Sequence, residues 1–464
     1  MNKSAKQDAE VQEFLFESVF EQEVSVSFDG AEQSSDGGAL LLGALDQKLK
    51  LSAALAAAFC DRRQAGKIDH GMLEMLRQRI YGIASGYEDG NDAGRLSRDA
   101  LFPLVCGKEE GELASASTLC RWENMAGWRD GLKMLRALAE TTIRQLRRTR
   151  GRKGLRRIIL DLDPTDDATH GQQEFSFFNG YYDSHCYLPL LAFVAFEGAE
   201  GEEPEQHLVA ALLRSGKAHG SACARGLMRI ILPLLREAFP GVPICVRLDG
   251  AYATPEVFSF LEAQGVKYMV NMAANAVLEK LAAPFLDIAR ERARRTKQTA
   301  KVYVRLWYRA QSWPQTRAVI VKAEVVVGPD GSLKDNPRFV VNNLDEVPRK
   351  IYARRYCRRG DVENRIKELK ETLALGRTSC SSFWANQFRV LLSAAAYVLM
   401  QGLRAACAGT ALERAQAQRL RDLLLKVSAR VSRVTRRVYV ELSSRYAWAA
   451  EWRQAAGRIV ALVT

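Results

Sequence analysis

Apolar residues divide the chain into a helical first part and a strand-containing middle. From Gly38 to about Glu140 they recur every three or four residues, as in ALLLGALDQKLKLSAALAAAF, which predicts amphipathic helices. Short apolar runs typical of strands follow, with helical patterns near 219–238 and 254–264. The runs cover residues 157–163, 187–196, 207–213, 243–249 and 266–271. Three strands followed by alternating helices and strands predict an α/β fold with helices on the sheet faces.

Residues 274–348 interrupt this alternation. They contain a basic helical segment, ARERARRTKQTAK, and three strand-like runs separated by turn residues. The helical pattern returns over 356–374 and continues from Trp384 to the end of the sequence. We therefore expect four parts. They are a mostly helical region over 1–150, an α/β core over 151–273 and 349–383, a β-rich insertion over 274–348, and a basic helical region over 384–464.

The composition is that of a folded and basic protein. Hydrophobic residues make up 47% and charged residues 26%, which excludes wholesale disorder. The formal net charge of +13 favours a polyanionic partner, usually nucleic acid. No stretch is long and apolar enough to span a membrane, and the first residues lack an apolar signal core. Nine scattered cysteines without a C-x-x-C pair favour reduced thiols in a cytoplasm or nucleus.

The positive charge is concentrated in a few segments. Residues 144–157 hold eight basic residues and no acid, which predicts a linker or a strap that contacts DNA, with a solvated charge run as the alternative. Residues 401–464 carry 12 basic and 4 acidic residues, an excess of 12 − 4 = +8. Four arginines there fall at helical spacing and suit a face that follows phosphates. They are Arg430, Arg433, Arg436 and Arg437.

Two of the strand-like runs end in aspartate, and the ends of such strands are where α/β sheets bind ligands. Asp163 lies at the exit of RIILDLD, and Asp249 ends PICVRLD, where the small Gly250-Ala251 leaves room for a phosphate or a metal. Asp163 is better placed than Asp161, although Asp161, Asp166 and Asp167 leave the first position open. The alternative for each is a turn-forming aspartate without further function.

A third carboxylate, Glu363, lies in the helical segment after the insertion. Tyr356, Arg359 and Lys370 stand at offsets −7, −4 and +7 from it, so one helical face would carry all four side chains. Three carboxylates suit a pair of hard divalent cations ~3.5–4 Å apart, an arrangement that supports phosphodiester cleavage. The alternative is a charged helix face exposed to solvent.

The segment YCRRGDVENRIKELK, residues 356–370, matches the pattern Y-x2-R-x3-E-x6-K at every defined position. With this pattern the chain resembles the DDE transposases of bacterial insertion sequences. The segments DPT at 163, THGQQEFSFFNGYYDSHCYLPL at 169 and RLD at 247 resemble the insertion-sequence group numbered 1380. SSDGGALL at 34 and GYEDGNDA at 86 do so as well, so the resemblance covers nearly the whole chain.

The resemblance implies a ribonuclease-H-like catalytic core with a β-strand insertion between the second aspartate and the glutamate. It implies that Asp163, Asp249 and Glu363 bind two Mg²⁺ ions, for which Mn²⁺ would substitute. Phosphates and terminal bases of the transposon end would be held by Tyr356, Arg359 and Lys370. Related enzymes stack a flipped base on an aromatic residue of the insertion, which makes Trp307 or Trp313 a candidate, with a place in the core as the alternative. Position alone suggests that Arg247 faces DNA.

The implied activity is DNA transposition. The enzyme would bind terminal inverted repeats through a DNA-binding region over 1–150, pair two ends as a homodimer, cleave them, and join the freed 3′-hydroxyl to target DNA, with a TTAA-like target. A bacterial, nucleoid-associated protein of the cytoplasm is expected. Two alternatives stay open, a structure-specific DNA nuclease and a non-catalytic DNA-binding regulator derived from a transposase. Strand transfer with precut ends separates the nuclease from the transposase, and binding without magnesium-dependent cleavage favours the regulator.

Overall fold

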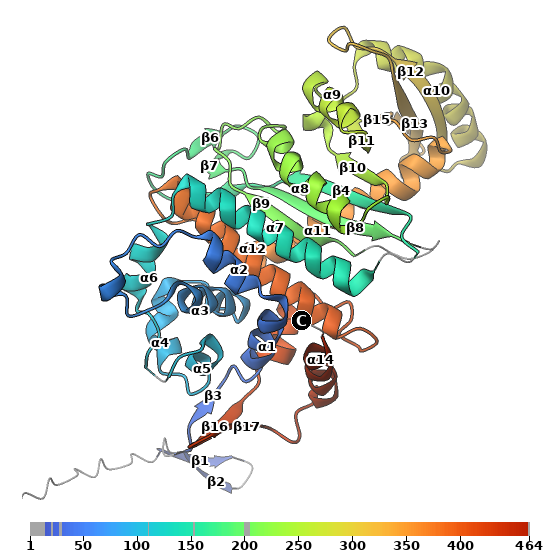
Figure 1. Cartoon of the computed structure of the whole chain (residues 1–464). Coiled ribbons are helices and arrows are strands. Elements are labelled where there is room, and N and C mark those ends of the chain that lie inside the picture. The colour runs from blue at the N-terminus through green and yellow to red at the C-terminus, as the bar shows by residue number, and fades with distance from the viewer. Residues whose placement is uncertain are drawn as a thin grey trace, which may run out of the picture.

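The computed structural model describes residues 14–19, 22–26, 30–109, 111–151, 154–198 and 205–462. A mixed sheet of nine strands forms the centre of the α/β part, and helices lie on its faces (Figure 1). The long helix α12 (Phe383–Ala406) lies between strand β9 and the helices of the first 150 residues. It is buried along almost its whole length, because it packs on both sides.

Five strands of the sheet match the apolar runs of the sequence. They are β4 (Arg157–Pro164), β8 (Leu190–Glu197), β9 (His207–Leu212), β10 (Ile244–Leu248) and β11 (Lys267–Met272). Their order is β9-β8-β4-β10-β11, with β10 parallel to both β4 and β11. The pairs β4–β8 and β8–β9 are antiparallel. The predicted α/β layering is confirmed, because helices α8 (Ala224–Ala238) and α9 (Pro255–Ala263) connect β9, β10 and β11 in turn.

The strands expected between 274 and 348 extend this sheet. Strand β15 (Arg338–Asn342) pairs antiparallel with β11, and β13 (Arg317–Val327) pairs with β15. Strand β12 (Ala300–Tyr308) forms the edge, and β14 (Leu333–Asp335) pairs with β13. The basic helix, α10 (Ala276–Thr296), covers β12 and β13. It begins earlier than the basic pattern suggests and ends before residues 300–301, which belong to β12.

The described residues of the first part of the chain are mostly helical. The long helix α7 (Trp128–Arg150) packs against β9 and the helix α2 (Leu51–Ala58). Helix α6 (Ala116–Glu123) begins after the cap Ser115, whose Oγ accepts from the Thr118 backbone N–H at 3.3 Å. The helices before α7 are α1 (Ala39–Leu49), α2 (Leu51–Ala58), α3 (Met72–Ala84), α4 (Ala93–Ser97), α5 (Phe102–Cys106) and α6 (Ala116–Glu123). Strands β1 (Phe14–Val19) and β2 (Gln22–Val26) form an antiparallel pair ahead of them.

The basic run 144–157 does not form one continuous strap. Its first half is the exposed end of α7, whereas Arg157 belongs to β4 and pairs with Glu346 at 2.9 Å. Arg152 and Lys153 lie outside the described residues. The run therefore combines a basic helix end with a structural ion pair of the sheet.

The prediction that the chain is helical from Trp384 to its end is wrong over residues 429–442. Helices α12, α13 (Ala417–Leu420) and α14 (Ala449–Ala461) are present, but β16 (Ala429–Val434) and β17 (Arg437–Leu442) form a hairpin. Strand β16 also pairs with β3 (Gln33–Ser34), and Val431 is buried against the N-terminal helices. The β-branched valines of both strands favour this pairing over a helix. The four arginines expected on a helix face are exposed on this hairpin instead.

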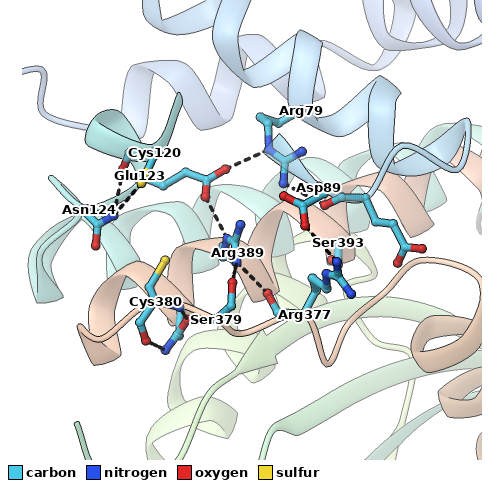
Figure 2. Close-up of polar contacts among 12 residues, drawn as sticks. Arg79, Asp89, Cys120, Glu123, Asn124, Arg377, Ser379, Cys380, Arg389 and Ser393 are labelled. Carbon is cyan, nitrogen blue, oxygen red and sulfur yellow. Dashed lines mark hydrogen bonds and ion pairs between the residues drawn. The ribbon is translucent and has the colours of Figure 1, made fainter. Parts of the chain in front are cut away.

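A buried ionic network joins the N-terminal helices to α12 (Figure 2). The Glu123 carboxylate accepts from Arg79 Nε and from Arg389 Nε, at 2.8 Å each. Arg389 also donates to the Arg377 carbonyl at 3.0 Å and to the Ser379 hydroxyl, and Arg377 pairs with Asp89 at 2.8 Å. Segments far apart in the sequence are thereby held together around one carboxylate.

Replacing Glu123 by alanine should destabilise the protein strongly. Glu123 is 2% exposed and pairs with two arginines, so its loss removes the negative charge that faces both guanidinium groups, at a cost of about 3–5 kcal/mol. Urea denaturation followed by circular dichroism measures this change. The matched control is Glu140→Ala, which removes an exposed pair with Arg136 and should cost less than about 1 kcal/mol. Equal losses in both variants would contradict the importance of the network.

Candidate active site

Asp163 and Asp249 lie side by side where β4 and β10 end. The two strands are parallel, and their register places Asp161 opposite Arg247. Two residues further along the chain are Asp163, still in β4, and Asp249, directly after the end of β10, so both follow the face of Asp161 and Arg247. The folding of two apolar runs into neighbouring parallel strands is therefore what brings the two carboxylates together.

Arg359 bridges these carboxylates. Its Nη2 atom lies 2.6 Å from Asp163 Oδ1 and 3.6 Å from Asp249 Oδ2. Arg359 belongs to the short 3₁₀ turn Cys357–Gly360, which precedes helix α11 (Asp361–Glu371). One guanidinium of the signature segment thus occupies the position between the two aspartates.

The surroundings make a charged Asp163 costly. Burial of this side chain raises its pKa to about 6, and the nearby negative charge of Asp249 acts in the same direction, against the opposing effect of Arg359. Asp163 is 7% exposed, so water screens this repulsion poorly. A further positive charge at this position would stabilise both carboxylates in their ionised form.

Asp161 is already neutralised by Arg247. Two hydrogen bonds of 2.6 Å join the guanidinium to the carboxylate, and Arg247 also donates to the Arg355 carbonyl at 2.7 Å. The expectation that Arg247 faces DNA does not fit this structure, because Arg247 is 3% exposed and committed to Asp161. The same pairing favours Asp163 over Asp161 as the available first aspartate.

The other two aspartates of that loop also have partners. Asp166 accepts from Lys370 Nζ at 2.8 Å. Asp167 accepts from the Thr378 hydroxyl at 2.7 Å, and burial raises the pKa of Asp167 to about 7. The pairing of Lys370 with Asp166 could not be found from the spacing of the signature, because it depends on the path of the loop after β4.

Glu363 lies in the first turn of α11, one turn beyond Arg359, and is exposed. Among the residues that the structure describes, no three side chains of the types that hold metal lie close enough to do so together. The structure therefore brings Asp163 and Asp249 together but does not add Glu363 to the same cluster. The carboxylate oxygens of Asp163 and Asp249 are hard ligands, and both face one positive group, the Arg359 guanidinium. Such a pair of carboxylates fits a site for divalent ions.

The segment expected as one helix over 356–374 is not a single helix, and only its part over Asp361–Glu371 is α-helical. A π-helical stretch, Lys350–Tyr356, is followed by the 3₁₀ turn and then by α11. Tyr356 ends the first stretch and packs against the Tyr352 ring at 5.9 Å. Burial raises the pKa of Tyr356 to about 12, so its hydroxyl keeps its proton at neutral pH. The simple argument from helical offsets is thus inaccurate before residue 361.

The two candidate tryptophans of the insertion have opposite environments. Trp307 is 70% exposed on the edge strand β12, so the alternative of a core position is wrong for this residue. Trp313 is 3% exposed and packs against Phe258 at 5.1 Å between ring centroids, which confirms a core position for it. Only Trp307 remains available to a ligand.

Paired aspartates at neighbouring strand ends, beside a basic segment, are typical of enzymes that cleave phosphodiesters with divalent metals. The model of the family Transposase DDE domain group 1 matches residues 16–464, and the chain belongs to this family. A search of the curated proteins found no match. The family consists of metal-dependent enzymes of DNA cleavage and strand transfer, and membership implies DNA binding and DNA transposition. Within the described part of the chain, no helix has the length and hydropathy to cross a membrane.

The deprotonation of Asp163 should lower the free energy of unfolding as the pH rises from about 4 to about 6. Its ordinary pKa is 3.8 and its pKa in the folded protein is about 6. The folded state therefore keeps a proton that the unfolded chain has lost, and the free energy of unfolding falls over this interval. Urea denaturation across this pH range measures the effect.

In this experiment Asp163→Asn should show a smaller decline than the wild type, because the titrating group is gone. Asp361→Asn, a change at an exposed aspartate, serves as the matched control and should retain the full decline. A decline of the same size in Asp163→Asn and wild type would contradict the assignment.

Proposed function

We propose that this protein is the transposase of an insertion sequence of the group numbered 1380. It binds terminal inverted repeats, cleaves the transposon ends and joins them to target DNA. The pairing of Asp163 and Asp249 around Arg359, one of the four defined residues of the pattern Y-x2-R-x3-E-x6-K, carries the proposal. The strand order β9-β8-β4-β10-β11 supports a ribonuclease-H-like core.

Asp163 and Asp249 are the proposed ligands of two Mg²⁺ ions, with Glu363 as the third. The chemistry of the donors supports this assignment, and so does the raised pKa of Asp163, because additional positive charge would stabilise its ionised form. When bound, such ions activate an attacking hydroxyl and stabilise the leaving oxygen. Mn²⁺ has the same preference for oxygen ligands and would substitute.

The basic and aromatic residues of the site would position DNA. Arg359 and Lys370 are held by Asp163 and Asp166 respectively, so both cations are already oriented near the end of β4. Tyr356 stays protonated and can donate to a phosphate oxygen. The exposed ring of Trp307 can stack on a flipped base. Exposed arginines of the hairpin 429–442 and of the end of α7 supply charge for the DNA backbone.

Two exchanges of a phosphorus–oxygen bond make up the proposed reaction. Water attacks the phosphorus at the transposon end, the bond to the 3′-oxygen breaks, and a 3′-hydroxyl and a 5′-phosphate result. The 3′-hydroxyl then attacks a phosphorus of the target strand and displaces a target 3′-oxygen. In each exchange one phosphorus–oxygen bond forms as another breaks: the first hydrolyses a phosphodiester, and the second replaces one phosphodiester by another. Neither ATP nor a covalent protein–DNA intermediate is needed. Two copies of the chain would hold the two ends together.

Asp249→Asn and Glu363→Gln should each reduce magnesium-dependent cleavage of the inverted-repeat end by at least about a hundredfold. Both changes remove a carboxylate charge while preserving side-chain size, so DNA binding should persist. The DNA that flanks the gene supplies the substrate, and denaturing gel electrophoresis measures cleavage. Asp361→Asn, on the same helix as Glu363, is the matched control and should cleave normally. Full cleavage by Asp249→Asn would refute the site.

A precut end tests whether the reaction continues beyond cleavage. Given an end with a free 3′-hydroxyl and a plasmid target, the wild type should form joined products in magnesium. Cleavage of intact ends without any joining would instead identify a structure-specific nuclease. Binding to the ends without either reaction would identify a DNA-binding regulator.

A further inference from the structure

An aromatic β-hairpin stands beside the candidate active site. It consists of β6 (Phe177–Asn179) and β7 (Ser184–Tyr187), and Figure 1 shows both near the end of the core sheet. Strand β5 (Asp167–Ala168) pairs with β7, with Asp167 opposite Tyr187. Strand β5 begins four residues after Asp163. Through its pairing with β7, the hairpin is therefore joined to the segment that directly follows the active-site strand β4.

The outer surface of this hairpin presents aromatic rings to solvent. Tyr181 is 87% exposed at the turn, and Phe178 is 52% exposed on β6. Phe178 lies opposite His185, with ring centroids 5.8 Å apart, and the Tyr181 ring lies 4.8 Å from that of Tyr182. Exposed rings gathered in one place on a folded protein mark a binding surface.

The base of the hairpin is firmly anchored. Asn179 donates to the Gly216 carbonyl at 2.9 Å, and its side-chain oxygen accepts from the Tyr181 backbone N–H at 3.0 Å. Gly216 approaches so closely that a Cβ atom there would lie 2.2 Å from the Cys186 carbonyl oxygen. Lys217 lies 4.5 Å from the Phe177 ring centroid. The exposed rings are therefore presented from a fixed support, which reduces the entropy lost when they bind a ligand.

The neighbourhood indicates which ligand these rings would take. Tyr182, next to Tyr181 in the turn, is close enough to Asp166 and Asp163 for both carboxylates to add to the effect of burial, which raises the pKa of its hydroxyl to about 12. The turn of the hairpin therefore lies on the side of the active site, where the bases next to a phosphodiester at Asp163 would be. Lys217 supplies positive charge at the base of the hairpin, and Lys370 lies near the connecting loop. Flat rings beside positive charge suit single-stranded nucleic acid, because every base has a face that can stack.

We propose that Tyr181 and Phe178 stack on nucleobases that are unpaired beside the cleaved phosphate, and so hold the end of the DNA duplex open. This inference rests on the proposed function, because it takes DNA as the substrate of the neighbouring site. The hairpin acts on the bases, whereas the carboxylates act on the phosphate, so the two roles can be separated by mutation.

Binding to a forked duplex with one unpaired arm, compared with a fully paired duplex of the same sequence, tests the proposal. Fluorescence anisotropy without magnesium measures both dissociation constants. The wild type should prefer the fork, and Tyr181→Leu and Phe178→Leu should each weaken fork binding by about tenfold while leaving the paired duplex unaffected. Tyr181→Phe should keep the preference, because stacking uses the ring and not the hydroxyl.

Two controls make the result specific. Trp128→Leu removes a ring of similar exposure (52%) from the start of α7 and should keep the fork preference. Replacing the bases of the arm by abasic sites should weaken the wild type more than Tyr181→Leu, because only the Phe178 ring is left to stack in that variant. Thermal unfolding of each variant verifies its folding, and the exposed Tyr181 should tolerate leucine without loss of stability.

The proposal is overturned if the wild type binds both duplexes equally or if Tyr181→Leu weakens both to the same extent. It is also overturned if the abasic arm binds the wild type as tightly as the natural arm. Asp249→Asn distinguishes this failure from failure of the proposed function. That variant should lose cleavage and keep the fork preference. Full cleavage by it would reject the proposed active site, whereas the role of the hairpin would still be decided by the binding measurements.

Discussion

Repulsion between two aspartates is the constraint around which this protein is arranged. Parallel strands β4 and β10 bring Asp163 and Asp249 together at the sheet end, and burial makes their negative charges costly. Asp161, two residues before Asp163 on β4, is also a buried carboxylate. Its negative charge is neutralised by two hydrogen bonds from the Arg247 guanidinium. At the sheet end a single guanidinium is shared between two carboxylates instead. The inner pair is therefore a buried ion pair, whereas the outer pair is the proposed place for divalent cations.

The position of Arg359 depends on contacts from distant parts of the chain. Just before it, Arg355 pairs with Glu346 and Glu197, and its carbonyl accepts from Arg247. After α11, Arg377 and Arg389 connect the chain to the N-terminal helices through Asp89 and Glu123 (Figure 2). The signature segment is thus held at both ends, and the N-terminal helices contribute to the geometry of a site that they do not enter.

The sequence alone predicted the parts of the fold that depend on local pattern. Apolar runs located β4, β8 and β10, because a buried strand needs continuous apolar residues. The hairpin 429–442 was missed, since its strands are stabilised by pairing with residues 33–34, which local periodicity cannot reveal. The same limit explains Arg247, whose burial depends on a partner 86 residues away. Spacing identified Glu363 as a candidate, and its place relative to the aspartates stays a prediction.

The proposed function requires Asp163 and Asp249 to share a site for a divalent cation. Anomalous diffraction from crystals of the full chain soaked in Mn²⁺ tests it most directly, because the scattering locates the ion independently of activity. We expect an anomalous peak in contact with both carboxylates, and its loss in Asp249→Asn crystals. Manganese bound elsewhere, with Arg359 still bridging Asp163 and Asp249 and no peak between them, would contradict it.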